Sequence, residues 1–179
     1  MHNDPNQLAA TTSLADAKAQ FIHLWGVSGT NWGVSKTLAQ VHALLLLSPQ
    51  ALSTEDIMEQ LTISRGNASM TVRELIDWGL IYKELRPGER REYVVAEKDM
   101  LQVTRCIIAA RKRRELDQMK RTLDQLAQLP GDAADPDYRT YYTVLTDIQQ
   151  LADVSDKLLT RLMKAERSWF WDKFLKLFL

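Results

Sequence analysis

The region from Leu52 to Glu97 constrains the fold of this chain more than any other part of the sequence. Ser53 is followed three residues later by Asp56, and this spacing is the capping-box pattern of a helix start. It predicts a short helix that continues to about Leu61. The turn 62–64 then leads to a second helix, which we predict over 64–78, because Ser64 can cap it.

Two segments rich in β-branched and aromatic residues, 80–85 and 92–96, follow the second helix. Between them lies Arg86-Pro87-Gly88-Glu89-Arg90-Arg91, in which proline presets φ and glycine tolerates positive φ. This pattern predicts a two-stranded wing over 80–96 with a basic tip. A short helix, a turn, a second helix and a ribbon in this order are typical of a winged helix-turn-helix.

The flanking sequence predicts further helices. Residues 1–13 have no apolar period and are interpreted as a flexible arm, whereas a helix should run from Leu14 to about Gly29 or Gly33. Ser35 can cap the next helix, which should stop at Ser48-Pro49. After the wing, residues 97–128 lack proline and glycine and predict one long helix, with a second apolar seam beyond Pro136.

These elements predict a mainly α fold: a winged helix-turn-helix domain with a two-stranded β-wing, flanked by N-terminal and long C-terminal dimerisation helices. The 179 residues, 45% of them hydrophobic, suffice for one ordinary core. We therefore predict three parts: a flexible arm at 1–13, N-terminal helices plus the winged domain at 14–97, and a helical dimerisation region at 98–179.

Composition limits the classes of function. The 23 basic and 23 acidic residues balance, so net charge gives no argument for nucleic-acid binding. The single cysteine, Cys106, cannot form an intrachain disulfide, and no apolar run resembles a signal peptide or a membrane span. We predict a cytoplasmic protein without a membrane span, without a cofactor or metal site, and without enzymatic activity, since no catalytic motif is present.

The second helix and the wing carry the candidate site. Placing Ala68, Val72 and Leu75 inward leaves Met70 and Arg73 facing outward, where a major groove could receive them. Asn67 and Arg73 are the candidates for base edges, and the wing arginines for the minor groove or flanking phosphates. The predicted DNA-binding residues are Ser64, Arg65, Gly66, Asn67, Ser69, Met70, Arg73, Arg86, Arg90 and Arg91. A solvated helix face and a charged hairpin are the alternative interpretation.

Several of these segments resemble the GbsR-like branch of the MarR-type transcription regulators. They are Ser64-Arg65-Gly66-Asn67-Ala68-Ser69-Met70, Arg73-Glu74-Leu75, Trp78-Gly79-Leu80, Pro87-Gly88-Glu89-Arg90 and the stretch from Tyr93 to Asp99. The resemblance runs from about Leu44 to Leu116 and fades toward both ends. It implies a dimeric repressor or activator whose terminal helices build the dimer, and it leaves the small-molecule effector open.

We therefore predict a homodimeric, sequence-specific regulator of a pseudo-palindromic double-stranded DNA operator, with repression as the expected mode. The alternative function is a winged-helix module that binds another protein without DNA specificity. The aromatic C-terminus, 168–179, is expected in the dimer interface, with a partner protein or a membrane surface as the other choices. The basic segment 105–121 is a charged patch or one solvated helix side.

Overall fold

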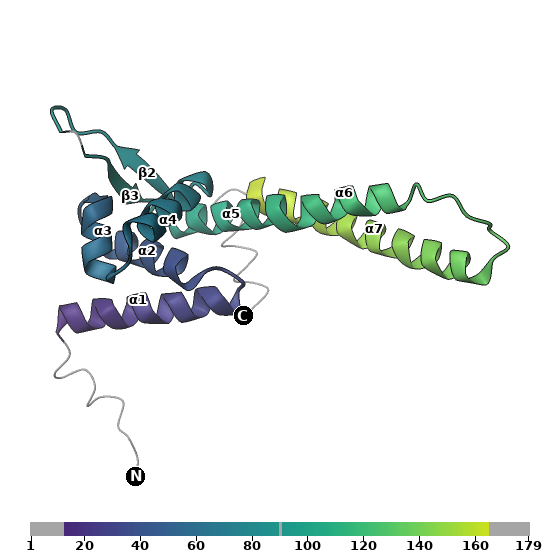
Figure 1. Cartoon of the computed structure of the whole chain (residues 1–179), viewed down its shortest axis with the longest axis horizontal. Coiled ribbons are helices and arrows are strands. Elements are labelled where there is room, and N and C mark those ends of the chain that lie inside the picture. Colours follow the sequence, from purple (N-terminus) through teal and green to yellow (C-terminus); the bar gives the residue numbers. More distant parts are fainter. Residues whose placement is uncertain (1–12, 90, 165–179) are drawn as a thin grey trace, which may run out of the picture. The chain divides into compact units, whose positions relative to one another are not determined.

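The computed structural model describes residues 13–89 and 91–164 (Figure 1). The chain divides into two compact units, Met1–Met100 and Leu101–Leu179. Arg90, nearly all of the predicted arm and the aromatic C-terminal segment 168–179 lie outside the described residues.

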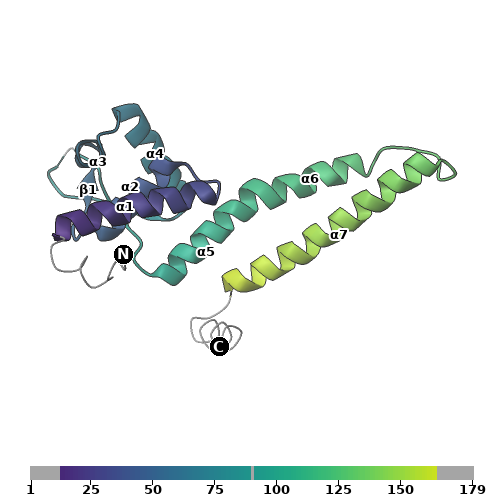
Figure 2. The same ribbon diagram turned by 90° about the horizontal axis from the view of Figure 1, so that it is seen from below.

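The first unit begins with two packed helices, α1 (Leu14–Asn31) and α2 (Lys36–Leu47), which lie side by side in both views (Figures 1 and 2). Ser35 caps α2, as predicted, by accepting a hydrogen bond from the backbone N–H of Leu38 at 3.1 Å. The helices approach closely at Gly29, where an added Cβ would lie 2.6 Å from the Cβ of Ala39. A larger residue at Gly29 would force the two helices apart.

The helix-turn-helix follows the predicted order, with α3 at Thr54–Leu61 and α4 at Arg65–Asp77. The Ser53 hydroxyl and the Asp56 carboxylate form both halves of the predicted capping box. Thr62, in the turn, has a left-handed backbone with φ of 53°. This conformation is unfavourable for a β-branched residue but closes the end of α3.

The sheet has three strands, whereas the sequence predicted only the two of the wing. Strand β2 (Ile81–Glu84) and strand β3 (Tyr93–Ala96) form the wing, and β1 (Leu52–Ser53) pairs antiparallel with β3 in the order β1-β3-β2. Leu52 pairs with Val94, and Ile81 pairs with Ala96. Strand β1 spans two residues, too few to produce the alternating pattern by which a strand is recognised.

Helix α2 lies at the centre of this unit, because it packs against α1, α3, α4 and β3. Its Val41 and Leu45 are buried, as are Ile57 of α3, Leu75 of α4 and Ile81 of β2. One core therefore joins the helix-turn-helix to the root of the wing. Burying a side chain of this size contributes about 1.5–3 kcal/mol.

The second unit contains a helical hairpin. The predicted uninterrupted helix over 97–128 is instead α5 (Met100–Arg111), a π-helical turn η2 (Lys112–Leu116) and α6 (Asp117–Leu126). A helical pattern with no proline or glycine gives no sign of a π-turn, which changes the hydrogen-bond register and not the residue types. Helix α7 (Pro136–Lys164) returns along α6, as both views show (Figures 1 and 2).

Buried Leu123, Leu145 and Ala152 form the core of the hairpin. Lys112 pairs with Asp117 at 2.8 Å and Asp156 at 2.9 Å, and Lys120 lies 2.9 Å from the same Asp156. Hydrogen bonds from Lys112 and Lys120 hold the pKa of Asp156 down at about 2. The ion pairs therefore persist at neutral pH and fix the register between η2, α6 and α7.

None of the helices within residues 13–89 and 91–164 is both long and apolar enough to cross a membrane. The same residues contain no group of three side chains that could hold a metal ion.

Candidate nucleic-acid interface

Helix α4 presents the outward face that the sequence predicts. Ala68 and Leu75 are completely buried, whereas Arg65, Gly66 and Arg73 are exposed. Met70 keeps 66% of its surface exposed. A free helix face of this kind has the dimensions that fit a DNA major groove.

The start of α4 is tied to neighbouring helices. Ser64 accepts a hydrogen bond from the backbone N–H of Asn67 at 3.3 Å, which confirms the predicted cap. The Asn67 side chain is half-buried and donates to the Thr37 hydroxyl of α2 at 3.5 Å. Its carbonyl oxygen accepts from Thr71 at 3.4 Å. Asn67 thus joins α4 to α2, and a contact with a base would require it to exchange these bonds.

Arg73 lies on the middle of the outward face. Its Nε donates to the backbone carbonyl of Ser69 at 3.3 Å, so the side chain runs back along the helix toward its N-terminus. Ser69 itself is half-buried beside this contact. Arg73 as a whole is exposed, as a base-edge contact requires.

Arg65 forms an ion pair that the sequence did not predict. Its Nη2 lies 2.8 Å from Oε1 of Glu55, in the first turn of α3. The hydrogen bond from Arg65 lowers the pKa of the Glu55 carboxyl. The two residues are ten positions apart and belong to different helices, so no helical spacing in the sequence could have indicated the contact.

The wing turns through residues 86–89, as the Pro-Gly sequence predicts. Gly88 has φ of 85°, and the backbone N–H of Glu89 donates to the carbonyl of Arg86 at 3.1 Å. This is the arrangement of a type II turn, which requires a residue with positive φ at its third position.

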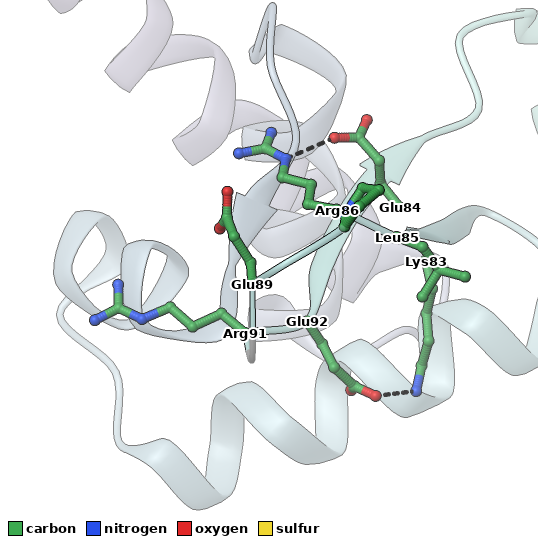
Figure 3. A pocket seen from close by; sticks show the side chains of 8 residues that line it. Lys83, Glu84, Leu85, Arg86, Glu89, Arg91 and Glu92 are labelled. Carbon is green, nitrogen blue, oxygen red and sulfur yellow. Dashed lines mark hydrogen bonds and ion pairs between the residues drawn. The ribbon is translucent and has the colours of Figure 1, made fainter.

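Arg86 is held inside the wing. Its Nε donates to Glu84 at 2.9 Å (Figure 3). Its guanidinium carbon lies 3.9 Å from the centre of the Tyr93 ring. The Glu84 hydrogen bond raises the pKa of Arg86. Cation–π stacking and the ion pair orient this side chain, so Arg86 stabilises the wing as well as carrying charge.

A hollow of about 400 Å³ lies at the wing. Charged residues of both signs surround it, including the ion pair of Lys83 with Glu92 at 2.7 Å (Figure 3). Arg91 points away from that pair and is exposed (Figure 3). Hydrogen bonds from Arg65 and Ser53 are the main causes that lower the pKa values of Glu55 and Asp56, and the charge of Arg91 adds a smaller lowering. The first turn of α3 contacts the start of α4 through Glu55.

Comparison with known proteins shows a family similarity over part of the chain. Residues 32–92 match the family model described as the MarR family. This part of the chain is therefore similar to a MarR-family domain. The match covers α2, the helix-turn-helix and most of the wing, which are the elements that hold every candidate DNA contact. A search of curated proteins found no significant match.

One solved structure shares the fold of most of this chain. A crystal structure described as a transcriptional regulator has a TM-score of 0.65 at 21% identity, covering 83% of this chain and 96% of that chain. The S. aureus MepR–DNA complex has a TM-score of 0.38 at 15% identity, covering 83% of this chain and 98% of that chain. A MarR family transcriptional regulator from Silicibacter pomeroyi has a TM-score of 0.34 at 20% identity, covering 83% of this chain and 94% of that chain. The similarity of fold rests on the first structure, because the other two have TM-scores under 0.5.

Proposed function

We propose that this protein is a sequence-specific DNA-binding transcription regulator that inserts α4 into the major groove and places the wing on flanking DNA. The observation that carries the proposal is the exposed face of α4 within the region similar to a MarR-family domain, with Met70 and Arg73 directed outward. Arg73 would contact base edges, where arginine pairs with guanine through two hydrogen bonds. Arg65, Arg90 and Arg91 would contact phosphates and position the protein.

The proposal includes a homodimer. Helix α7 carries Val144, Ile148, Leu151 and Leu158 at spacings of three, four or seven residues, and all four are at least 40% exposed. This stripe differs from the face of α7 that holds Leu145 and Ala152 against α6. An exposed apolar stripe at this spacing is suited to packing against the same helices of a second copy. Two copies would place two α4 helices on a pseudo-palindromic site.

Within the MarR-type regulators we propose the GbsR-like branch, on the sequence segments from Ser64 to Met70 and from Tyr93 to Asp99. Repression is the expected mode, because a dimer bound at an operator blocks other proteins from the same DNA. A small-molecule effector would act by changing the spacing of the two α4 helices.

Selection of bound sequences from a random duplex pool tests the proposal. The wild-type chain should enrich a palindrome, and its affinity should fall steeply with added salt because bound phosphates release counterions. Arg73→Ala should lose discrimination between bases by about 1–3 kcal/mol per half-site. Arg90→Ala combined with Arg91→Ala should weaken binding to all sequences and flatten the salt dependence.

A matched control is Arg139→Ala, which removes an exposed arginine from α7, outside the winged domain. It should leave the enriched sequence unchanged. If no sequence is enriched at any salt concentration, the regulator proposal is wrong, and the alternative of a protein-binding winged-helix module takes its place.

A further inference from the structure

In the free protein, Glu55 forms an ion pair with Arg65, one of the proposed DNA-binding arginines. The Arg65–Glu55 distance is 2.8 Å, and the two side chains are 73% and 44% exposed. An ion pair this exposed contributes little to folding stability, because water screens it and both side chains lose freedom. Its main consequence is therefore geometric: it engages a hydrogen-bonding edge of Arg65 that a phosphate would otherwise use.

The positions of the two residues in their helices favour the pair. Glu55 lies in the first turn of α3, where the helix dipole stabilises an acid. Arg65 is the first residue of α4, where the same dipole disfavours a cation and attracts an anion. A phosphate that approaches the start of α4 is thus attracted by the helix and by Arg65, and is repelled by the Glu55 carboxylate.

Asp56, the acid next to Glu55, belongs to the helix cap. Asp56 accepts hydrogen bonds from the Ser53 backbone and hydroxyl, at 2.8 and 2.7 Å. Glu55 has no part in that capping box, and its carboxylate pairs with Arg65. The structure therefore places one carboxylate that is not needed for the capping box beside an arginine of the proposed DNA-contacting helix.

We infer that Glu55 weakens non-specific DNA binding by competing with phosphate for Arg65. This inference rests on the proposed function and adds to it a residue that limits the phosphate-contact part of the affinity. On any duplex, Arg65 must give up its hydrogen bond with Glu55 before it can bind a phosphate, and this cost reduces the free energy gained from the phosphate contact.

The test compares Glu55→Gln with Glu59→Gln in the full chain. Both changes remove one negative charge from α3, but Glu59 is an exposed residue one helical turn further on, for which no ion pair with an arginine is seen among the described residues. Binding to a short random-sequence duplex is measured by fluorescence anisotropy at several salt concentrations. Circular dichroism checks that each variant is folded.

Glu55→Gln should tighten random-duplex binding about 1.5- to 5-fold per half-site, the factor that corresponds to the coupling of an exposed ion pair. The dependence of log affinity on log salt should steepen by up to about 0.9 per half-site, because Arg65 gains a phosphate. Affinity for the selected operator should rise by at least the same factor, because Arg65 must leave Glu55 there too. Glu59→Gln should change neither quantity by a comparable amount.

Glu55→Gln in an Arg65→Gln background shows whether Glu55 acts through Arg65 or directly on the DNA. If Glu55 acts by competition, Glu55→Gln should have no more effect there than Glu59→Gln. Equal effects of the two glutamate changes in the wild-type background would overturn the inference while leaving DNA binding established. A full Glu55→Gln effect without Arg65 would also overturn it, in favour of simple charge repulsion. If the wild-type chain binds no duplex, the proposed function fails, and the inference fails with it.

Discussion

The capping box at the start of α3 can be tested by a single substitution, Ser53→Ala. Ser53 is completely buried. Its hydroxyl accepts from the backbone N–H of Asp56 at 3.2 Å and donates to the Asp56 carboxylate at 2.7 Å. Alanine removes both bonds and leaves the backbone N–H of Asp56 without its acceptor.

The expected loss follows from these contacts. Removing a serine N-cap costs about 0.5–2 kcal/mol, and we expect the upper end, about 2 kcal/mol, because the Ser53 hydroxyl is buried and also donates to Asp56. In a unit of this size about 1 kcal/mol lowers the midpoint of thermal unfolding by roughly 4–8 °C. Ser53→Ala should therefore lower it by about 8–16 °C. Ser64→Ala, which removes an exposed cap with a longer 3.3 Å bond, should cost about 0.5 kcal/mol.

The loss should also depend on pH. Hydrogen bonds from the Ser53 backbone and hydroxyl lower the pKa of Asp56 below 3.8. A carboxyl whose pKa is lowered by folding stabilises the protein above its unfolded pKa, and this contribution disappears as pH falls through the folded value. The difference between wild type and Ser53→Ala should therefore be full at pH 7 and should shrink below about pH 4.

Urea unfolding followed by circular dichroism, at neutral pH and near pH 3, measures both effects. Two results would refute the reasoning. One is a Ser53→Ala loss no larger than that of Ser64→Ala. The other is a loss that stays constant down to low pH, since the carboxylate would then have no share in the cap.

Three further predictions concern other positions. Thr62→Asn should stabilise the chain by about 0.5–1 kcal/mol in urea unfolding, since asparagine tolerates the left-handed backbone better than threonine does; a lower midpoint would contradict this. Gly88→Ala should destabilise the wing turn by about 1 kcal/mol, because an L-residue is strained at φ of 85°. Hydrogen exchange at the Glu89 amide should then be about fivefold faster, and an unchanged rate would count against it. Leu151→Glu should shift the chain toward the monomer in sedimentation without unfolding it, whereas the exposed neighbour Gln150→Glu should not; equal behaviour would remove α7 from the proposed dimer contact.

The helix-turn-helix could be predicted because its signals are local. The caps at Ser35, Ser53 and Ser64 each involve a hydrogen bond to a residue three positions away, and the inward face of α4 follows from the helical period. The turn at Gly88 depends on two adjacent residues. Each of these features is fixed by a few neighbouring residues, so the sequence specifies it without knowledge of the rest of the fold.

The candidate site was predicted in part. The sequence identified the exposed residues of α4 and the basic wing, but it treated Arg65 and Arg86 as available to DNA. The structure assigns Arg65 to Glu55 and Arg86 to Glu84 and Tyr93. An exposed arginine has many partners within reach, and only the folded arrangement selects one of them.

The sequence by itself therefore determined the helices of the winged domain, their caps, the wing turn and the outward face of α4. Only the tertiary structure decided the pairing of Leu52 with Val94, the link from Asn67 to Thr37 and the Arg65–Glu55 ion pair. These contacts join residues that are ten or more positions apart on different elements. Their formation depends on how the core packs those elements together, and no periodicity along the chain records that packing.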